Sequence, residues 1–88
     1  MNIYKKPSFF RDIKKIIYPA LKEQVEQVIL SVQEAKTTRD IPELKKMKGY
    51  KIHYRIKVGR YRIGLTIEND LATFEAFDHR KDFYKRFP

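Results

Sequence analysis

The stretch YKIHYRIKVGRYRIGLTI, residues 50–67, decides the fold of this chain. Apolar side chains occupy every second position of its first half, and basic side chains or a histidine stand between them. A period of two is typical of β-strands that bury one face. The alternation restarts after a turn at Val58-Gly59, so the stretch predicts a hairpin with one apolar face and one cationic face. The residues predicted to face the core are Tyr50, Ile52, Tyr54, Ile56, Val58, Tyr61, Ile63, Leu65 and Ile67.

The cationic face belongs to a longer run that carries a single sign of charge. Residues 45–62 contain neither Asp nor Glu. Like charges that face each other across a sheet destabilise it, so a merely solvated surface explains this run poorly. We therefore expect the face to bind a polyanion. The basic residues of the run are Lys45, Lys46, Lys48, Lys51, Arg55, Lys57, Arg60 and Arg62.

The kinds of side chain present narrow the choice of polyanion. Arg55, Arg62 and Arg80 offer planar guanidinium groups that match phosphate oxygens. Four tyrosines offer stacking surfaces: Tyr50, Tyr54, Tyr61 and Tyr84. The first three lie on the core-facing register, where we expect core aromatics, whereas Tyr84 lies beyond the last predicted strand. Basic and aromatic residues interleaved in this way suit a single RNA strand better than a DNA groove. The predicted RNA-binding residues are Lys51, His53, Lys57 and Arg60, with His53 open to a role as base, phosphate contact or plain strand residue.

Length and composition limit the class of protein. The 88 residues suit one domain spanning 1–88, and 42% hydrophobic residues suffice for a single modest core. The absence of Cys excludes disulfides and thiolate metal sites. No segment approaches the roughly 20 apolar residues that span a bilayer, so we expect a cytoplasmic protein. A net charge of +9 favours anionic partners, with nucleic acid first, an acidic protein second and a membrane surface a distant third.

Proline and polar residues mark the predicted boundaries of the first strand and the two helices. Residues 1–5 are expected to form an edge strand, and Ser8 suits the N-cap of a first helix. Tyr18-Pro19 ends that helix and begins a second one. The second helix has an apolar stripe made of Leu21, Val25, Val28, Ile29 and Val32.

After a loop at 35–42, the rest of the chain is predicted to be mainly strands. The expected elements are strands near 50–58, 60–68 and 71–77, an Asn69-Asp70 turn, and a short helical segment at 80–87. The fold class is therefore α+β, in the order β-α-α-β-β-β with a short C-terminal helical segment. Two N-terminal helices would pack on one face of a small antiparallel sheet and leave the Lys/His/Arg face exposed.

The last predicted strand carries two residues with expected structural roles. His79 leaves this strand just before the terminal segment, which it is expected to cap or orient. Alternation predicts that Glu75 points outward, where it would pair with Arg62, with a role as general base as the alternative. The same alternation predicts Ala76 in the core and Phe77 outside.

The run YRIKVGRYRIGLTIENDLATFEAF, residues 54–77, followed by DHRKDFYKRFP, residues 78–88, resembles the RelE/ParE toxin superfamily of type II toxin–antitoxin modules. The recurring signature of that family is a basic hairpin, an acidic turn, a hydrophobic strand and a terminal HRKDVY-like segment. The match is close from Met47 to Phe87 and looser before it.

The resemblance implies a small toxin that is neutralised by a cognate acidic antitoxin. In the RelE-like branch the toxin enters the ribosomal A site and cuts messenger RNA, with no metal ion and no small-molecule cofactor. The residues that match the family's catalytic positions are Arg55, Arg62, Arg80 and Tyr84. Arginines would stabilise the phosphorane-like transition state, and Tyr84 would handle a proton as acid or base.

Two alternatives to the RNA-cutting toxin stay open at this point. A ParE-like toxin inhibits DNA gyrase and shares the fold and much of the terminal signature. A family member that has lost its activity would only bind RNA or its antitoxin. We favour the ribosome-dependent endoribonuclease because the basic residues and Tyr84 are all present together, although His53 stands where some members have Lys.

Overall fold

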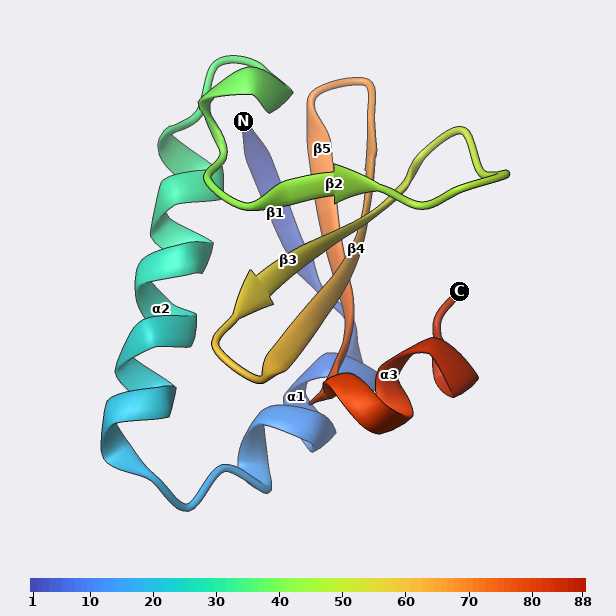
Figure 1. Cartoon of the computed structure of the whole chain (residues 1–88). Helices are drawn as coiled ribbons and strands as arrows, with labels where there is room; N and C mark the ends of the chain where they lie inside the picture. Colours follow the sequence, from blue (N-terminus) through green and yellow to red (C-terminus); the bar gives the residue numbers. More distant parts are fainter.

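A computed structural model describes every residue from Met1 to Pro88 (Figure 1). The predicted order of elements is confirmed, with one additional strand and a single-turn 3-10 helix, η1. The bounds are β1 Asn2–Lys5, α1 Pro7–Lys14, α2 Pro19–Glu34, η1 Thr38–Asp40, β2 Leu44–Lys46, β3 His53–Val58, β4 Tyr61–Glu68, β5 Leu71–His79 and α3 Arg80–Arg86. None of the helices is long and apolar enough to cross a membrane.

The five strands form one sheet in the order β1-β5-β4-β3-β2. The three strands predicted after the helices pair antiparallel, as does the additional strand β2 beside β3. The first strand differs from the expectation, because β1 runs parallel to β5 and pairs Ile3 with Ala72. The sheet is therefore mixed rather than purely antiparallel. A parallel neighbour requires a long crossover, which the two helices and the rest of the sheet provide.

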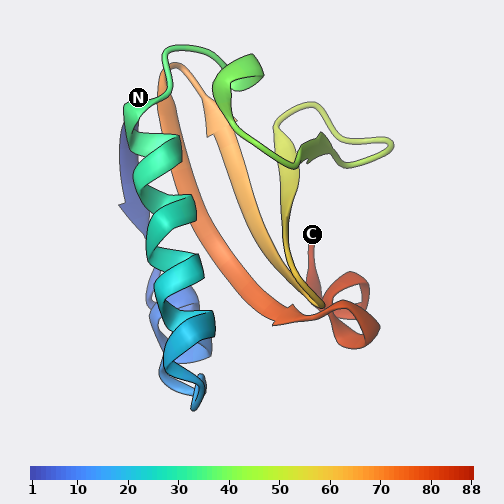
Figure 2. The ribbon, with the colours of Figure 1, turned by 60° about the vertical axis from the view of Figure 1, so that its left-hand side comes forward.

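Helices α1 and α2 cover one face of the sheet, as predicted (Figure 2). Val25 and Val32 of α2 are completely buried in the main core together with Phe9 of α1. The start of α1 was predicted two residues too late, because Lys6 and not Ser8 occupies the N-cap position and Pro7 is the first helical residue. The Ser8 hydroxyl instead donates a hydrogen bond of 2.7 Å to the Glu75 carbonyl and ties α1 to the sheet.

The predicted β3–β4 hairpin is confirmed, but it begins later than expected and its turn lies one residue beyond the predicted Val58-Gly59. Gly59 and Arg60 form its two-residue turn, with Gly59 at φ +59°. Its first strand begins at His53, so the prediction that Tyr50 lies in a strand and faces the core is wrong. A turn closed by the Tyr50 N–H and the Met47 carbonyl occupies that segment and leaves Tyr50 46% exposed.

A β-bulge in β5 reverses which side chains of its second half point toward the main core, so that part of the prediction is wrong. Leu65 pairs with Phe74 while Gly64 pairs with Ala76, so Glu75 is an extra residue opposite the partner strand. One extra residue reverses the alternation beyond it. Phe77 therefore joins the main core under the helices, and Ala76 lies on the opposite face.

The face opposite α1 and α2 is not left open as expected, because α3 folds back across part of it (Figure 2). Phe83 and Phe87 form a second, small core with Ala76, against which Met47 packs. Gly64, in the middle of the sheet, leaves the space that the Phe87 ring occupies, since a Cβ at Gly64 would lie 2.7 Å from that ring. The C-terminal segment is thus an integral part of the fold.

Candidate functional site

A shallow basic hollow of about 300 Å³ lies between β2, β3 and α3. We call it the basic hollow, and its lining residues are Lys45, Lys46, Met47, Lys48, Arg55 and Tyr84. The lysines come from β2 and the residues just after it, the arginine comes from β3 and the tyrosine comes from α3. No carboxylate lines the hollow, so its field is positive throughout. Such a site is suited to bind and stabilise a phosphate group.

The register of β2 against β3 builds the strand side of the basic hollow. Lys45 pairs directly with Arg55, and their side chains lie on the same face of the sheet. The Arg55 guanidinium is held by one hydrogen bond of 3.1 Å to the Glu43 carbonyl, which leaves its other donors unused by the protein. An arginine anchored in this way presents a preorganised positive group to an anion.

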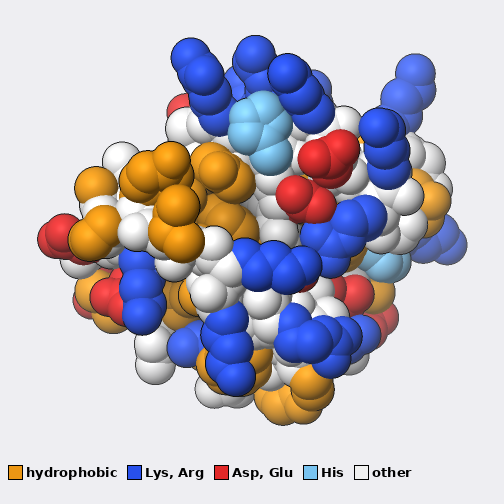
Figure 3. Space-filling model, turned by 90° about the horizontal axis from the view of Figure 1, so that it is seen from below, with side chains coloured by type: hydrophobic (Ala, Val, Ile, Leu, Met, Phe, Trp, Pro, Cys, Tyr) orange, Lys and Arg blue, Asp and Glu red, His pale blue; other side chains and the backbone are white.

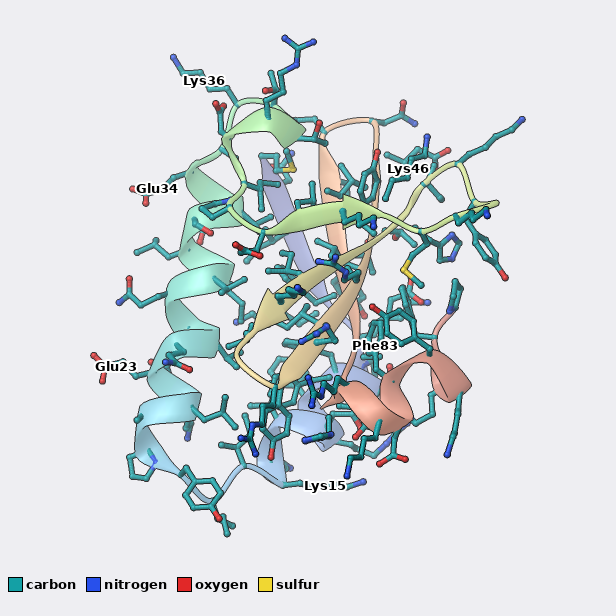
Figure 4. All side chains as sticks on the ribbon, in the orientation of Figure 1. Lys15, Glu23, Glu34, Lys36, Lys46 and Phe83 are labelled. Carbon is teal, nitrogen blue, oxygen red and sulfur yellow. The ribbon has the colours of Figure 1, made fainter.

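The α3 side of the basic hollow is positioned by aromatic packing. Phe83 lies on the side of α3 that faces the sheet and is completely buried (Figure 4). The Tyr84 ring stands edge-on to Phe83 at 5.0 Å between ring centroids and is 55% exposed. The predicted capping role of His79 is confirmed, because its Nδ1 accepts a hydrogen bond from the Lys81 N–H at the start of α3.

A charged network fixes the far end of α3. The Arg86 guanidinium contacts both carboxylate oxygens of buried Asp12 at 3.0 and 3.1 Å, and Asp78 at 2.6 Å. Asp12 also accepts a hydrogen bond from the Phe77 N–H. Burial alone would raise the pKa of Asp78, but the hydrogen bonds and charges of Arg86 and its neighbours outweigh this and hold that pKa below 3.8. The hydrogen bond to Asp78 likewise raises the pKa of Arg86.

The structure brings together some of the predicted catalytic residues and separates others. Arg55 and Tyr84 line the same hollow. Arg62 is only 8% exposed, and its Nη1 donates hydrogen bonds to the Gly59 and Tyr61 carbonyls. Arg80 is exposed at the first residue of α3, where its N–H donates to the Arg60 carbonyl.

The predicted RNA-binding residues fall into two groups. Lys57 and Arg60 are exposed near the tip of the β3–β4 hairpin. Seen from below, the molecule shows many Lys and Arg side chains, with a histidine, a few acidic side chains and an apolar area among them (Figure 3). Lys51 is exposed in the loop before β3. His53 is half-buried, with its ring between Tyr50 at 5.1 Å and Phe87 at 5.6 Å.

Sequence reasoning missed several residues that matter to this site. Three lysines of the basic hollow were counted as part of the charge run but were not selected, because β2 was not predicted: Lys45, Lys46 and Lys48. Asp12 and Arg86 were also missed. The available signal for Asp12 was its place between Phe9 and Ile13 in the first helical segment, where an acidic residue among apolar ones requires a partner. The expected pairing of Glu75 with Arg62 is wrong, since Glu75 lies 3.5 Å from Lys6.

Comparison with known proteins identifies the family. No family model matches the chain. A protein named Toxin RelE3 from Methanocaldococcus jannaschii is 33% identical over 90 residues, with complete coverage of both chains. The toxin of a RelB-RelE antitoxin-toxin complex from Methanococcus jannaschii is 30% identical, with a TM-score of 0.81 over 97% of this chain and 99% of its own. The RelBE2 complex of Mycobacterium tuberculosis shares the fold at 17% identity, with a TM-score of 0.72 over 90% of this chain and 96% of its own.

The likeness covers every element, including those that carry the basic hollow. The chain therefore belongs to the RelE family of toxins.

Proposed function

We propose that this protein is the toxin of a type II toxin–antitoxin pair and that it cleaves messenger RNA in the ribosomal A site. One observation carries the proposal: Arg55 and Tyr84, distant in sequence, line one hollow whose other charged members are all lysines. Binding an RNA phosphate and assisting its transesterification requires such a combination of fixed cations and one group that can exchange a proton. The proposal implies a cytoplasmic protein.

The proposed reaction is an in-line displacement at one phosphate. The ribose 2′-oxygen loses its proton to a base and forms a bond to phosphorus, and the bond from phosphorus to the 5′-oxygen breaks. The 5′-oxygen takes up a proton, which leaves a 2′,3′-cyclic phosphate and a 5′-hydroxyl end. Arg55 stabilises the negative charge on the equatorial oxygens, and Tyr84 takes part in one of the two proton transfers. The cations of the hollow supply the positive charge, so the proposed reaction uses no metal ion or cofactor.

The proposal also includes phosphate contacts outside the hollow. They would be made by Arg62, Arg80 and the basic residues of the hairpin. Arg80 and the exposed residues at the hairpin tip would contact neighbouring phosphates of the message or of ribosomal RNA. The hairpin turn uses only the Nη1 of Arg62, which leaves its Nη2 as a donor for a phosphate. The Nε of Arg62 is buried without a hydrogen-bond partner, so a phosphate oxygen there would satisfy a donor that the protein leaves unpaired.

We propose a cognate antitoxin as the second partner. Several similar solved structures are complexes of a RelE-type toxin with a RelB-type antitoxin. The net charge of +9 favours an acidic partner, and a partner that binds only the folded toxin would stabilise it. Co-expression with the candidate antitoxin should yield a complex that survives purification.

The test is a cell-free translation reaction with purified protein, in which messenger RNA 5′ ends are mapped by primer extension. New ends that require translating ribosomes are expected with the unchanged protein. Arg55→Ala should reduce their rate of appearance about 10²–10³-fold, the usual cost of removing one donor that stabilises a developing negative charge. Tyr84→Phe should reduce it because it removes only the hydroxyl.

Arg39→Ala is the matched control, because Arg39 is exposed in η1, outside the basic hollow. It should cut at the unchanged rate. Intact message in the presence of folded protein would overturn the RNA-cutting proposal. Inhibition of DNA gyrase by the same preparation would then identify the ParE-like alternative, and inactivity in both assays would identify a binding protein.

A further inference from the structure

We propose that the loop of residues 47–52 carries a stacking site for one unpaired RNA base, with the Tyr50 ring as its surface. The proposal rests on the RNA-directed function proposed above and adds to it a ligand contact outside the basic hollow. The ligand is a nucleobase of a single strand, recognised by its flat face and not by its hydrogen-bonding edge.

The conformation of the loop presents the Tyr50 ring to solvent. The Tyr50 N–H donates a hydrogen bond of 3.1 Å to the Met47 carbonyl, and Gly49 between them adopts φ +85°. This tight turn lifts Tyr50 out of the strand that follows and leaves it 46% exposed. A large aromatic side chain at such exposure keeps a free face, although burial of that face would be favourable.

The ring is also held in place before any ligand arrives. Its centroid lies 5.1 Å from that of His53, at an angle of 59° between the planes, and His53 in turn packs against Phe87 at 5.6 Å. Side-chain freedom lost in the unbound protein need not be lost again on binding, so a fixed ring stacks on a base at lower entropic cost.

The position of Tyr50 relative to the basic hollow suits successive nucleotides of one strand. Lys48 lines the hollow with Arg55 and Tyr84, and it stands two residues before Tyr50. His53 lies two residues before Arg55 on the same strand and on the same face of the sheet. A phosphate held in the hollow would therefore have its neighbouring nucleotide beside the 47–52 loop.

The charge of the loop supports the same ligand. Lys48 and Lys51, on either side of Tyr50, are exposed, and the segment contains no acidic residue. Basic side chains that follow the backbone and aromatic rings that stack on the bases are the two elements of single-strand binding sites. Tyr18 is also exposed, but its neighbours in the sequence are Ile17 and Pro19, so it lacks the flanking lysines of Tyr50.

The test is the affinity of the isolated protein for a short fluorescent single-stranded RNA at low salt. Tyr50→Ala should weaken binding about tenfold to a hundredfold, the usual effect of losing one base–aromatic stack. Tyr50→Phe keeps the ring and should bind within about twofold of the unchanged protein. Tyr18→Ala is the matched control and should have no effect, since it removes an exposed tyrosine far from the loop in sequence and outside the basic hollow.

A set of RNAs with single abasic positions gives a second, independent measurement. At one position, loss of the base should weaken binding to the unchanged protein as much as Tyr50→Ala does, and should have no further effect on Tyr50→Ala. The proposal is overturned if the unchanged protein does not bind the RNA, if Tyr50→Ala binds as tightly as the control, or if no abasic position removes the difference.

These outcomes separate the stacking site from the proposed cleavage. Messenger RNA that stays intact during translation, with a loss of RNA affinity in Tyr50→Ala, would overturn the cleavage and leave the stacking site in place. Ribosome-dependent cuts, with equal RNA affinities for Tyr50→Ala and the control, would overturn the stacking site alone.

Discussion

Two arginines of the same hairpin stand in different surroundings. Arg55 is half-buried and donates one hydrogen bond to the Glu43 carbonyl. Arg62 is almost fully buried and donates to both the Gly59 and Tyr61 carbonyls. The first residue is therefore free to act on a ligand, whereas the second also supports the turn that joins β3 to β4. Their substitution should separate activity from stability.

Arg62→Ala is expected to lower the free energy of unfolding by about 1 kcal/mol, in proportion to the intramolecular hydrogen bonds it removes. Arg55→Ala should leave that free energy within about 0.5 kcal/mol, although it reduces cleavage. Urea unfolding followed by circular dichroism measures both. Arg60→Ala, an exposed neighbour in the turn, is the control. Equal stability of the two variants would mean that the bonds of Arg62 contribute nothing to the fold.

The buried carboxylate of Asp12 gives Arg86 a role in stability, because Arg86 is its charged partner. Arg86→Ala would leave Asp12 with only the Phe77 N–H as a partner. An uncompensated buried carboxylate is costly, and because the Arg86 side chain is partly exposed we expect a loss of about 2 kcal/mol. Lys85→Ala, at the adjacent and exposed position, should cost almost nothing. A difference near zero between the two in thermal or urea unfolding would contradict the assigned network.

At the scale of elements, the packing of the C-terminal segment on the sheet depends on the absence of a side chain at Gly64. Gly64→Ala would put a Cβ 2.7 Å from the Phe87 ring, so the ring would have to move. We expect a loss of about 1–3 kcal/mol from overpacking, together with weaker protection of α3 amides in hydrogen exchange. Cleavage should fall as well, because the same segment holds Tyr84 at the basic hollow.

A double substitution tests this explanation. Once Phe87→Ala has removed the ring, Gly64→Ala should cost much less than it does in the unchanged protein. An equal cost in both backgrounds would show that strain in the strand, and not the contact with the ring, is responsible.

Elements with a clear period were predictable from the sequence, and elements without one were not. The apolar stripe of α2 and the alternation from His53 to Ile67 were sufficient to identify a helix and a hairpin. Strand β2, only three residues long, has no pattern of its own and exists because β3 offers it an edge. The alternation also continued by chance into the loop at Tyr50, where Gly49 was the contrary signal.

The candidate site was predictable to the extent that single residues could be matched to a motif. Arg55 and Tyr84 were selected from the sequence, and the structure places both in the basic hollow. The lysines of that hollow depend on the pairing of Lys45 with Arg55, which no local pattern encodes. The bulge at Glu75 likewise follows from the fit of two strands, so the exchange of Ala76 and Phe77 between faces could not be predicted.

At the scale of the whole molecule, an excess of positive charge makes stability sensitive to acid. The pKa of Asp78 is lower in the folded protein than its ordinary value of 3.8, so the unfolded chain takes up a proton more readily. The stability that Asp78 contributes is therefore fully present above about pH 4 and is lost as the pH falls through the folded pKa. Protonation of carboxylates would also raise the net charge above +9 and increase self-repulsion.

Asp78→Asn should therefore be less stable than the unchanged protein at pH 7 but should lose less stability between pH 4 and pH 2. Urea unfolding at a series of pH values measures this slope. Asp82→Asn is a suitable control, because Asp82 is exposed and its lysine partner is 3.8 Å away. Parallel stability curves for Asp78→Asn and the unchanged protein would contradict the assigned effect of Asp78.

The parallel pairing of β1 with β5 has a consequence for the time course of folding. Asn2 pairs with Leu71, so the sheet joins segments from the two halves of the chain. Long-range strand pairing incurs its entropic cost of loop closure before contacts compensate for it, and it slows folding. Helices α1 and α2, made first, lack the strand surface against which they bury their apolar side until β3, β4 and β5 have been synthesised. Assembly of the native state is therefore a late and concerted event for this chain, with its helices open to aggregation or proteolysis until then.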